Sequence, residues 1–318
     1  MMKQPPMAPG ARILGLGDYQ PSNILTNDDL AQRVDTSDEW IRSRVGITER
    51  RIAGPEDTVE SMAAIAGGKA IAASGLTPDA IDLVIVATCT QHDQIPNAAA
   101  TVAARLGITA PGAYDINAAC AGFCYGLGVA SDQVRAGSAR NALVIGSEKL
   151  SDWVDWTDRS TCVIFADGAG AAVVSASDTP GIGPMVSGSS GERADKIYLR
   201  DHKYLHQEGQ AVFRWTTTEL TEVALTAMKR AGVDPGELTA FVPHQANLRI
   251  VESIARKLGA PQAIIARDIV TAGNTSSASI PLALSRMIER GELPSGGTVL
   301  TLGFGAGLTY AAQVLEIP

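Results

Sequence analysis

Two halves of this chain repeat each other, and that duplication limits the folds that the chain can adopt. Residues 75–90 (GLTPDAIDLVIVATCT) align without a gap with residues 232–247 (GVDPGELTAFVPHQAN). In each copy a helical pattern of small residues precedes the stretch, and a turn then leads into an apolar strand. Strands and helices that alternate at this spacing predict βαβ units and a mostly parallel sheet. The repeat is too long for a solenoid module, so we interpret it as a duplicated half-domain.

The duplication predicts an N-terminal half over residues 1–175 and a C-terminal half over residues 176–318. Two motifs reach nearly matching positions, because DINAAC, which ends at Cys120, aligns one residue out of step with DIVTAGN, which ends at Asn274. His244 ends the apolar strand of the second copy. Catalytic side chains of α/β folds collect at strand ends. We therefore predict that a thiol, an imidazole and an amide meet at one pseudo-twofold junction.

The composition is that of a globular protein with a large core. The 318 residues are 45% hydrophobic, and the net charge of −8 argues against nucleic acid as the main partner. No apolar run approaches the roughly 18 residues that a membrane span requires, and prolines occupy the N-terminus where a signal peptide needs an apolar segment. We therefore expect a cytoplasmic protein with no membrane contact. The four cysteines lack paired secretory spacing, which favours reduced thiols.

Several other motifs are incomplete. Residues 15–20 lack the third glycine of a dinucleotide loop, and residues 67–70 lack the Ser or Thr of a phosphate loop. His202 and His206 are four residues apart, but the polar stretch around them predicts a solvated loop and not a metal site. Cys124 has no obvious set of further ligands, so we interpret it as a packing residue of a helix. The sequence predicts no metal and no redox cofactor.

Cys120 has the surroundings of a nucleophile. Small residues flank it in NAACAG, and it lies where a turn enters a helix over roughly residues 121–135. The unpaired N–H groups and the dipole of a helix start can lower a thiol's pKa to roughly 3.5–7.5. Taken alone, a free cysteine is more often a small buried apolar residue. His244 alone would be an ordinary strand-end histidine and Asn274 a helix N-cap, so the prediction depends on all three together.

The motifs resemble those of β-ketoacyl-acyl-carrier-protein synthase III, the initiating condensing enzyme of dissociated fatty-acid synthesis within the thiolase-like superfamily. The resemblance covers nearly the whole chain and is carried by TSDEWIRSRVGITERR, DINAACAGF, TDRST, FADGAGA, PHQANLRI, GNTSSASIP and GFGAG. It implies an α/β fold of five layers, αβαβα, built from two duplicated halves, and an active homodimer. It also implies that Cys120, His244 and Asn274 are the catalytic triad.

The resemblance implies a reaction in two stages. An acyl-CoA acylates Cys120, and malonyl-acyl-carrier protein then loses CO2 and condenses with the acyl group to give a β-ketoacyl product. The backbone N–H groups of Cys120 and of Ala306, in GFGAG, are expected to hold the oxyanions. His244 and Asn274 are expected to stabilise the thioester enolate. Acyl-CoA is a substrate, so no cofactor is implied.

The same resemblance implies a binding site for CoA. Trp40 and Arg159 are expected to sandwich the adenine, and Arg44 to meet a phosphate. Thr36 belongs to the same site, and it begins TSDE, a capping-box pattern that predicts a helix carrying Trp40. Core packing is the alternative role of Trp40.

Basic residues follow His244 at helical spacing and imply contact with the acidic carrier protein. They are Arg249, Arg256 and Lys257, together with Arg214 at a matching family position. An ordinary solvated helix face is the alternative.

The resemblance also bears on the acyl starter. The loop over residues 90–96 is expected to cross a dimer interface and close the partner's acyl pocket. Many acetyl-selective members carry Phe where Ile95 stands, so we predict a pocket that accepts more than acetyl. The alternative is that Ile95 only packs the interface. Residues 189–209 are shorter and more polar than the corresponding family segment, which leaves the tunnel mouth unassigned.

Related classes of protein share parts of this set of motifs. A degradative thiolase would carry a second catalytic cysteine in the C-terminal glycine turn, and residues 300–310 have none. A non-catalytic partner subunit would lack Cys120. An acyltransferase acting on an alcohol or amine could use the same Cys120 and His244, and priming of polyketide assembly also stays open.

Overall fold

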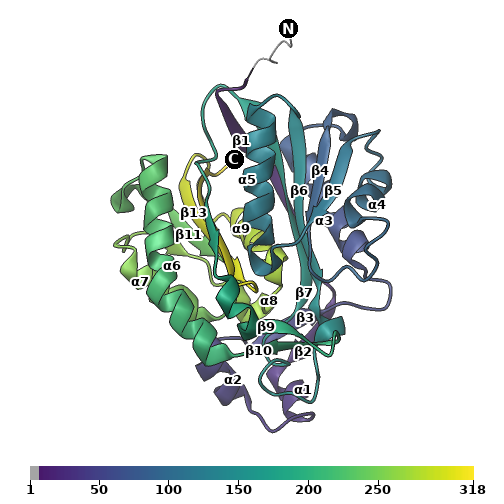
Figure 1. Cartoon of the computed structure of the whole chain (residues 1–318), viewed down its shortest axis with the longest axis vertical. Coiled ribbons are helices and arrows are strands. Elements are labelled where there is room, and N and C mark those ends of the chain that lie inside the picture. Colours follow the sequence, from purple (N-terminus) through teal and green to yellow (C-terminus); the bar gives the residue numbers. More distant parts are fainter. Residues whose placement is uncertain (1–6) are drawn as a thin grey trace.

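Within residues 7–318, which the computed structural model describes, two five-stranded sheets form the centre of the molecule (Figure 1). The first sheet has the strand order β1-β7-β6-β4-β5. Strand β4 is parallel to β5 and β6, whereas β7 is antiparallel to both β6 and β1. These strands are β1 (Gly10–Tyr19), β4 (Leu83–Ala87), β5 (Gly112–Ile116), β6 (Asn141–Lys149) and β7 (Asp167–Ser177).

The second sheet repeats this pattern in the order β12-β11-β13-β14-β8. Strand β11 is parallel to β12 and β13, whereas β14 is antiparallel to β13 and β8. These strands are β8 (Val186–Ser189), β11 (Ala240–Pro243), β12 (Ile264–Ile265), β13 (Thr298–Gly305) and β14 (Thr309–Glu316). The predicted mostly parallel sheet is therefore wrong, because half of the strand pairs in each sheet are antiparallel. A short turn joins β13 to β14, so this pair needs no crossover helix.

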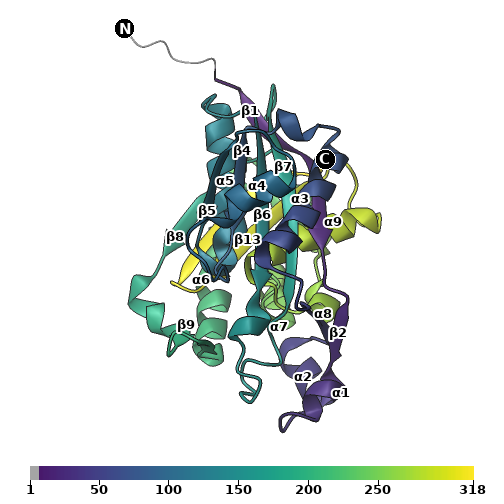
Figure 2. The same ribbon diagram turned by 90° about the vertical axis from the view of Figure 1, so that its right-hand side faces the viewer.

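Helices fill three layers around the two sheets. Helices α3 (Val59–Ser74) and α4 (Ala98–Arg105) cover the outer face of the first sheet, and α6 (Gly209–Ala231) and α7 (Leu248–Lys257) lie outside the second (Figures 1 and 2). Helices α5 (Gly122–Arg135) and α9 (Ser279–Glu289) pack between the sheets. One apolar cluster surrounds the central helices, and a separate cluster lies under each outer helix layer. The order of layers confirms the predicted five-layer αβαβα fold.

The remaining elements gather at one end of the molecule (Figure 1). They are β2 (Asn23–Thr26), α1 (Asn27–Ala31), α2 (Asp38–Val45), β3 (Glu49–Ile52), β9 (Ile197–Arg200), β10 (Tyr204–Gln207) and α8 (Ile269–Ala272). Helix α2 begins as predicted, but Ser37 and not Thr36 caps it, because the Ser37 hydroxyl accepts from the Trp40 N–H at 3.1 Å.

The prediction of a solvated loop around His202 and His206 is wrong for residues 204–207, which form a strand. Strands β9 and β10 form an antiparallel hairpin, and His206 lies in β10 with its ring 5.1 Å from that of Tyr198. Alternate residues of the hairpin are apolar, so one of its faces has a surface to bury.

Among the described residues no helix is long and apolar enough to cross a membrane. Residues 1–6, which carry part of the N-terminal pattern used against a signal peptide, lie outside the described residues.

Helix α9 lies so close to β7 that a glycine is required between them. A Cβ atom on Gly170 would lie 2.4 Å from the backbone nitrogen of Leu282. We expect Gly170→Ala to lower the free energy of unfolding by about 1–3 kcal/mol, because either the helix or the strand must shift. Gly68→Ala in α3 is the matched control, since its Cβ would meet only Leu106 at 3.5 Å. Urea denaturation of both variants checks this, and equal midpoints would contradict it.

Candidate functional site

A cavity of about 1020 Å³ lies where the two halves meet. Residues that the sequence singled out come together on its wall, and they come from both halves of the duplication. They are Cys120, His244, Asn274 and Ala306 at its inner end, and Trp40, Arg44, Arg214 and Arg249 toward α2, α6 and α7.

Cys120 lies in a tight turn, Ala119–Ala121, that leads into α5. Ala119 has a left-handed backbone with φ of 45°, and its N–H donates to the Asn117 side-chain oxygen at 3.1 Å. The glycine turn of the other half covers the nucleophile closely, since a Cβ on Gly305 would lie 2.7 Å from the Cys120 Cβ. Only glycine therefore fits at position 305 while Cys120 keeps its place.

The thiol of Cys120 is protonated in the free protein. Burial raises the pKa of Cys120 to about 12, and the negative charge of Glu148 acts in the same direction, although a hydrogen bond with the Ser276 hydroxyl opposes both. The expected lowering of this pKa is therefore wrong. The physical reason is that the loss of water around the sulfur outweighs the hydrogen bond with Ser276, which is the largest effect that lowers this pKa.

His244 is neutral at physiological pH. It follows β11, is 1% exposed, and burial lowers its pKa to about 3. Its Nδ1 lies 2.7 Å from the Ser279 hydroxyl, which accepts from the Gln245 N–H at 3.2 Å. We assign the Ser279 hydroxyl as the donor to Nδ1, which places the imidazole proton on Nε2. The Phe304 ring packs against the imidazole at 5.1 Å, nearly perpendicular to it.

Asn274 is held by backbone bonds from the first half of the chain. Its N–H donates to Ile164 O at 3.0 Å, and its carbonyl accepts from Ala166 N at 2.9 Å. Its side-chain oxygen accepts from the Ser276 N–H at 2.8 Å, which leaves the NH2 group as the free end of the amide. The alternative of a plain helix N-cap is wrong, because the N-cap of α9 is Ala278.

The structure corrects the alignment of the two halves. The separation that relates Gly75 to Gly232 also relates the first residues of α5 and α9. At that separation Cys120 corresponds to Ser277, and Asn274 corresponds to Asn117, whose side-chain oxygen makes the same bond two residues onward. The predicted match of Cys120 with Asn274 is therefore wrong. The shared DI dipeptides misled the alignment, because DIV lies in the short helix α8 and DIN ends a strand.

The residues expected to bind CoA cluster around Trp40. The Arg159 guanidinium lies 5.0 Å from the Trp40 ring centre, and the Arg44 guanidinium lies 5.9 Å from it. Arg159 also donates to the carbonyl of Asp35 at 2.7 Å. The Thr36 hydroxyl is buried and has no hydrogen-bond partner. Trp40 itself is half-buried and lines the cavity, so core packing does not occupy the whole ring.

The basic residues expected to meet the carrier protein lie on α6 and α7. Arg249 is exposed at the start of α7, with its guanidinium 5.3 Å from the Phe213 ring centre. Arg256 and Lys257 end the same helix, and Lys257 donates to the carbonyl of Thr217 on α6. Arg249 and Arg214 reach the cavity, whereas Arg256 and Lys257 do not line it.

Two features of this cavity were not predicted from the sequence. The β9–β10 hairpin forms part of its wall through Ile197, Leu199 and Leu205, and the segment's overall polarity hid this alternation. Glu148 is completely buried near Cys120, and nothing in the sequence motif GSEK distinguishes it from a solvated carboxylate. Ile95 does not line the cavity of the single chain and is 91% exposed.

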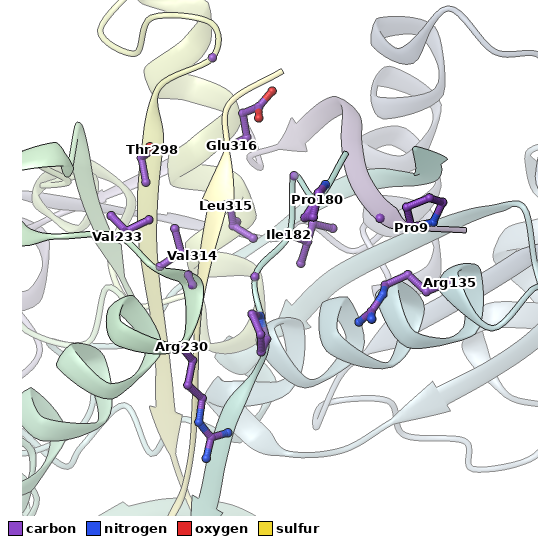
Figure 3. Close-up of a pocket in the computed structure, with 16 residues that line it drawn as sticks. Pro9, Arg135, Pro180, Ile182, Arg230, Val233, Thr298, Val314, Leu315 and Glu316 are labelled. Atoms are coloured by element: carbon purple, nitrogen blue, oxygen red, sulfur yellow. The ribbon is translucent and has the colours of Figure 1, made fainter. Parts of the chain in front are cut away.

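A second cavity, of about 370 Å³, lies at the opposite end of α6 (Figure 3). Arg135, Arg230 and Glu316 point into or along it, and no residue of the predicted site lines it. Along α6 the first cavity reaches Thr217 and the second begins at Arg230, so roughly 20 Å of helix lies between them. Within residues 7–318 no three His, Cys, Asp or Glu side chains are grouped so that they could hold a metal ion.

Comparison with known proteins gives one consistent result. The family model of 3-oxoacyl-[acyl-carrier-protein] synthase III matches residues 114–191, and the model of its C-terminal part matches residues 228–317. The chain is 55% identical to β-ketoacyl-[acyl-carrier-protein] synthase III 4 of Streptomyces coelicolor over 98% of this chain and 100% of that protein.

Solved structures agree with the sequence comparisons. The 3-oxoacyl-[acyl-carrier-protein] synthase III of Aquifex aeolicus has a TM-score of 0.93 at 42% identity, over 96% of this chain and 100% of that one. The priming β-ketosynthase of the R1128 polyketide pathway has a TM-score of 0.97 at 40% identity, over 100% of this chain and 99% of that one.

The protonated state of Cys120 leads to a pH prediction. A thiol with a pKa of about 12 is mostly protonated at pH 7, and its thiolate fraction grows about tenfold for each pH unit below the pKa. We expect the iodoacetamide alkylation rate of Cys120 in the free protein to keep rising from pH 7 to pH 10. Mass spectrometry of the modified peptide measures it, with Cys120→Ala as the blank. A rate that levels off below pH 8 would show that the thiol is already ionised there.

Proposed function

The chain belongs to the 3-oxoacyl-[acyl-carrier-protein] synthase III family, and we propose that Cys120 is the nucleophile of its reaction. His244 and Asn274 complete the proposed catalytic triad. The protein is an acyltransferase that condenses an acyl group from acyl-CoA with malonyl-acyl-carrier protein in fatty acid biosynthesis. One observation supports the assignment of roles, namely that a thiol, a neutral imidazole and an amide line a single cavity.

In the first half-reaction the Cys120 sulfur attacks the thioester carbon of acyl-CoA. The carbon–sulfur bond to CoA breaks, and CoA leaves with the electron pair and takes up the proton that the Cys120 thiol gives up. The negative charge on the carbonyl oxygen is held by the backbone N–H groups of Cys120 and Ala306. The contact of Gly305 with Cys120 supports this role, because it brings the glycine turn beside the sulfur.

In the second half-reaction malonyl-acyl-carrier protein loses CO2 and leaves a thioester enolate. The enolate oxygen accepts hydrogen bonds from His244 Nε2–H and from the Asn274 NH2 group. A neutral imidazole suits this role, since it donates a hydrogen bond without giving up its proton to the enolate. The enolate carbon then attacks the acyl group, and the Cys120 sulfur leaves.

We assign the mouth of the cavity to CoA. The adenine binds between Trp40 and Arg159, Arg44 meets a phosphate, and Thr36 supplies a hydroxyl beside them. A flat ring that binds between two groups holds them about 7 Å apart, which is twice a van der Waals contact. The Arg159 guanidinium now lies 5.0 Å from the Trp40 ring centre. Arg159 therefore has to move away from Trp40 when CoA binds.

The carrier protein is assigned to the basic surface of α6 and α7, formed by Arg214, Arg249, Arg256 and Lys257. Positive charges beside a cavity mouth favour an acidic partner and increase its rate of association. We further assign a cytoplasmic homodimer without a cofactor, with the halves of each chain meeting near residue 175. Ile95 is 91% exposed, and β5 is an unpaired edge strand of its sheet. Both observations support a dimer that covers these surfaces.

Priming of a polyketide pathway is the second candidate. The R1128 priming β-ketosynthase, with its TM-score of 0.97, favours it. Both candidates use the same half-reactions, so the acyl starter separates them and the triad does not.

The triad assignment is tested by separating the half-reactions. We expect Cys120→Ala to form no acyl adduct with acyl-CoA, because Cys89, the other thiol on the cavity wall, is bonded to the Glu148 carboxylate at 3.5 Å. His244→Ala and Asn274→Ala should still be acylated, whereas their condensation rates fall about 10²–10³-fold, as for loss of an oxyanion donor. Intact-mass analysis measures acylation, and product formation from malonyl-acyl-carrier protein measures condensation. An adduct on Cys120→Ala would refute the nucleophile.

The starter assignment is tested at Ile95. We expect the wild type to use isobutyryl-CoA or hexanoyl-CoA at least as well as acetyl-CoA, because Ile leaves more room than Phe in the partner's pocket. Ile95→Phe should shift the preference toward acetyl-CoA by about 10–200-fold in kcat/KM, the range for one or two methylene groups. Ile95→Leu is the matched control of nearly equal volume. A strong wild-type preference for acetyl-CoA would contradict the assignment.

A further inference from the structure

Glu148 is a completely buried carboxylate at the end of β6. Among residues 7–318 no Lys, Arg or His forms an ion pair with it. Within that range its oxygens accept hydrogen bonds only from neutral donors, which are hydroxyl groups, backbone N–H groups and one thiol. A carboxylate that is buried without a cation is costly unless its oxygens are well satisfied, so such a group is retained for what it holds in place.

One carboxylate oxygen of Glu148 binds the first half of the chain. Oε2 accepts from the Thr90 hydroxyl at 2.7 Å, from the Thr90 N–H at 3.1 Å and from the Cys89 N–H at 3.1 Å. The Thr88 hydroxyl lies 3.2 Å away. These bonds fix the segment that follows β4 and leads to Ile95.

The other oxygen binds the second half, and it also accepts from the Cys89 N–H at 3.3 Å and from the Cys89 thiol at 3.5 Å. Oε1 lies 3.1 Å from the Ser276 hydroxyl and 2.8 Å from the Ser277 hydroxyl. The Ser277 hydroxyl also lies 2.8 Å from the carbonyl of Ala87, so its single proton is shared between two acceptors of the first half. Ser277 is pressed against β6 as well, because a Cβ on Gly146 would lie 2.4 Å from its carbonyl oxygen.

The turn held by Glu148 is strained and orients Asn274. Ser276 has a left-handed backbone with φ of 50°, a conformation that residues with a side chain rarely adopt. The N–H of this same residue donates to the Asn274 side-chain oxygen at 2.8 Å. The direction of that N–H therefore decides which way the Asn274 amide points.

The duplicated copy shows what the carboxylate adds. Ala119 corresponds to Ser276, has φ of 45°, and donates in the same way to Asn117. Ala119 has no hydroxyl, so no carboxylate can hold its side chain. The anchored form of the turn occurs only in the copy that carries Asn274.

We propose that Glu148 is a positioning residue for the condensation half-reaction: its carboxylate holds the Ser276–Ser277 turn and thereby keeps the Asn274 amide directed at the enolate. This inference rests on the proposed function of Asn274. It assigns Glu148 no contact with the substrate and no proton transfer. Its charge raises the pKa of Cys120, so its removal does not slow formation of the thiolate.

The test uses Glu148→Gln and the milder Ser277→Ala in the full-length protein. We expect kcat for condensation with malonyl-acyl-carrier protein to fall about tenfold to a hundredfold, because a displaced donor stabilises the enolate less. The KM for the carrier protein and the rate of acylation by acyl-CoA should stay within about threefold of wild type. Ser175→Ala is the matched control, since it removes a buried serine hydroxyl bonded to Asn141 at 2.6 Å, outside the cavity.

A double-mutant cycle separates positioning from general stability. In the Asn274→Ala background we expect Glu148→Gln to cause less than about a twofold further loss of condensation, because the amide that it positions is gone. An additive loss would overturn the inference. So would a wild-type condensation rate in both Glu148→Gln and Ser277→Ala. If Asn274→Ala alone condenses at the wild-type rate, the proposed function of Asn274 has failed instead.

Discussion

The close approach of the two sheets to the helices between them is the constraint on which the rest of the structure depends. Glycines stand where backbone meets backbone: Gly146 under Ser277, Gly170 under Leu282 and Gly305 over Cys120. Each contact joins one half of the duplication to the other. A side chain at any of them would separate the layers and open the junction at which the cavity lies.

The same burial sets the chemistry of the cavity. Loss of water keeps the Cys120 thiol protonated and the His244 imidazole neutral, so the inner end offers neutral donors and a neutral nucleophile. The cationic side chains stay at the mouth, where Arg44, Arg214 and Arg249 retain water. The arrangement matches a reaction whose substrates carry most of their negative charge on CoA and on a carrier protein, while the thioester carbon that Cys120 attacks is neutral.

Much of this protein was predictable from local patterns. The repeat predicted two similar α/β halves, the family resemblance implied the five layers, and the helices α2 and α5 begin within one residue of the predicted starts. The predictions failed where distant segments decide the outcome. The pKa of Cys120 depends on burial by residues far along the chain, and the β9–β10 hairpin packs on a cavity that the sequence does not display. Antiparallel pairs such as β1 with β7 and β8 with β14 join segments that are distant in the chain.

The sequence by itself determined that the chain is a duplicated α/β protein and that His244 ends a strand of the second copy, because strand periodicity and the repeat are local properties. Only the tertiary structure decided how the halves correspond. It matches Cys120 with Ser277 and Asn117 with Asn274, because both copies have a left-handed residue followed by a helix start at these positions. The shared DI dipeptides do not mark this correspondence. It also decided that Glu148 is a buried link between the halves, because burial depends on what the fold places around a residue.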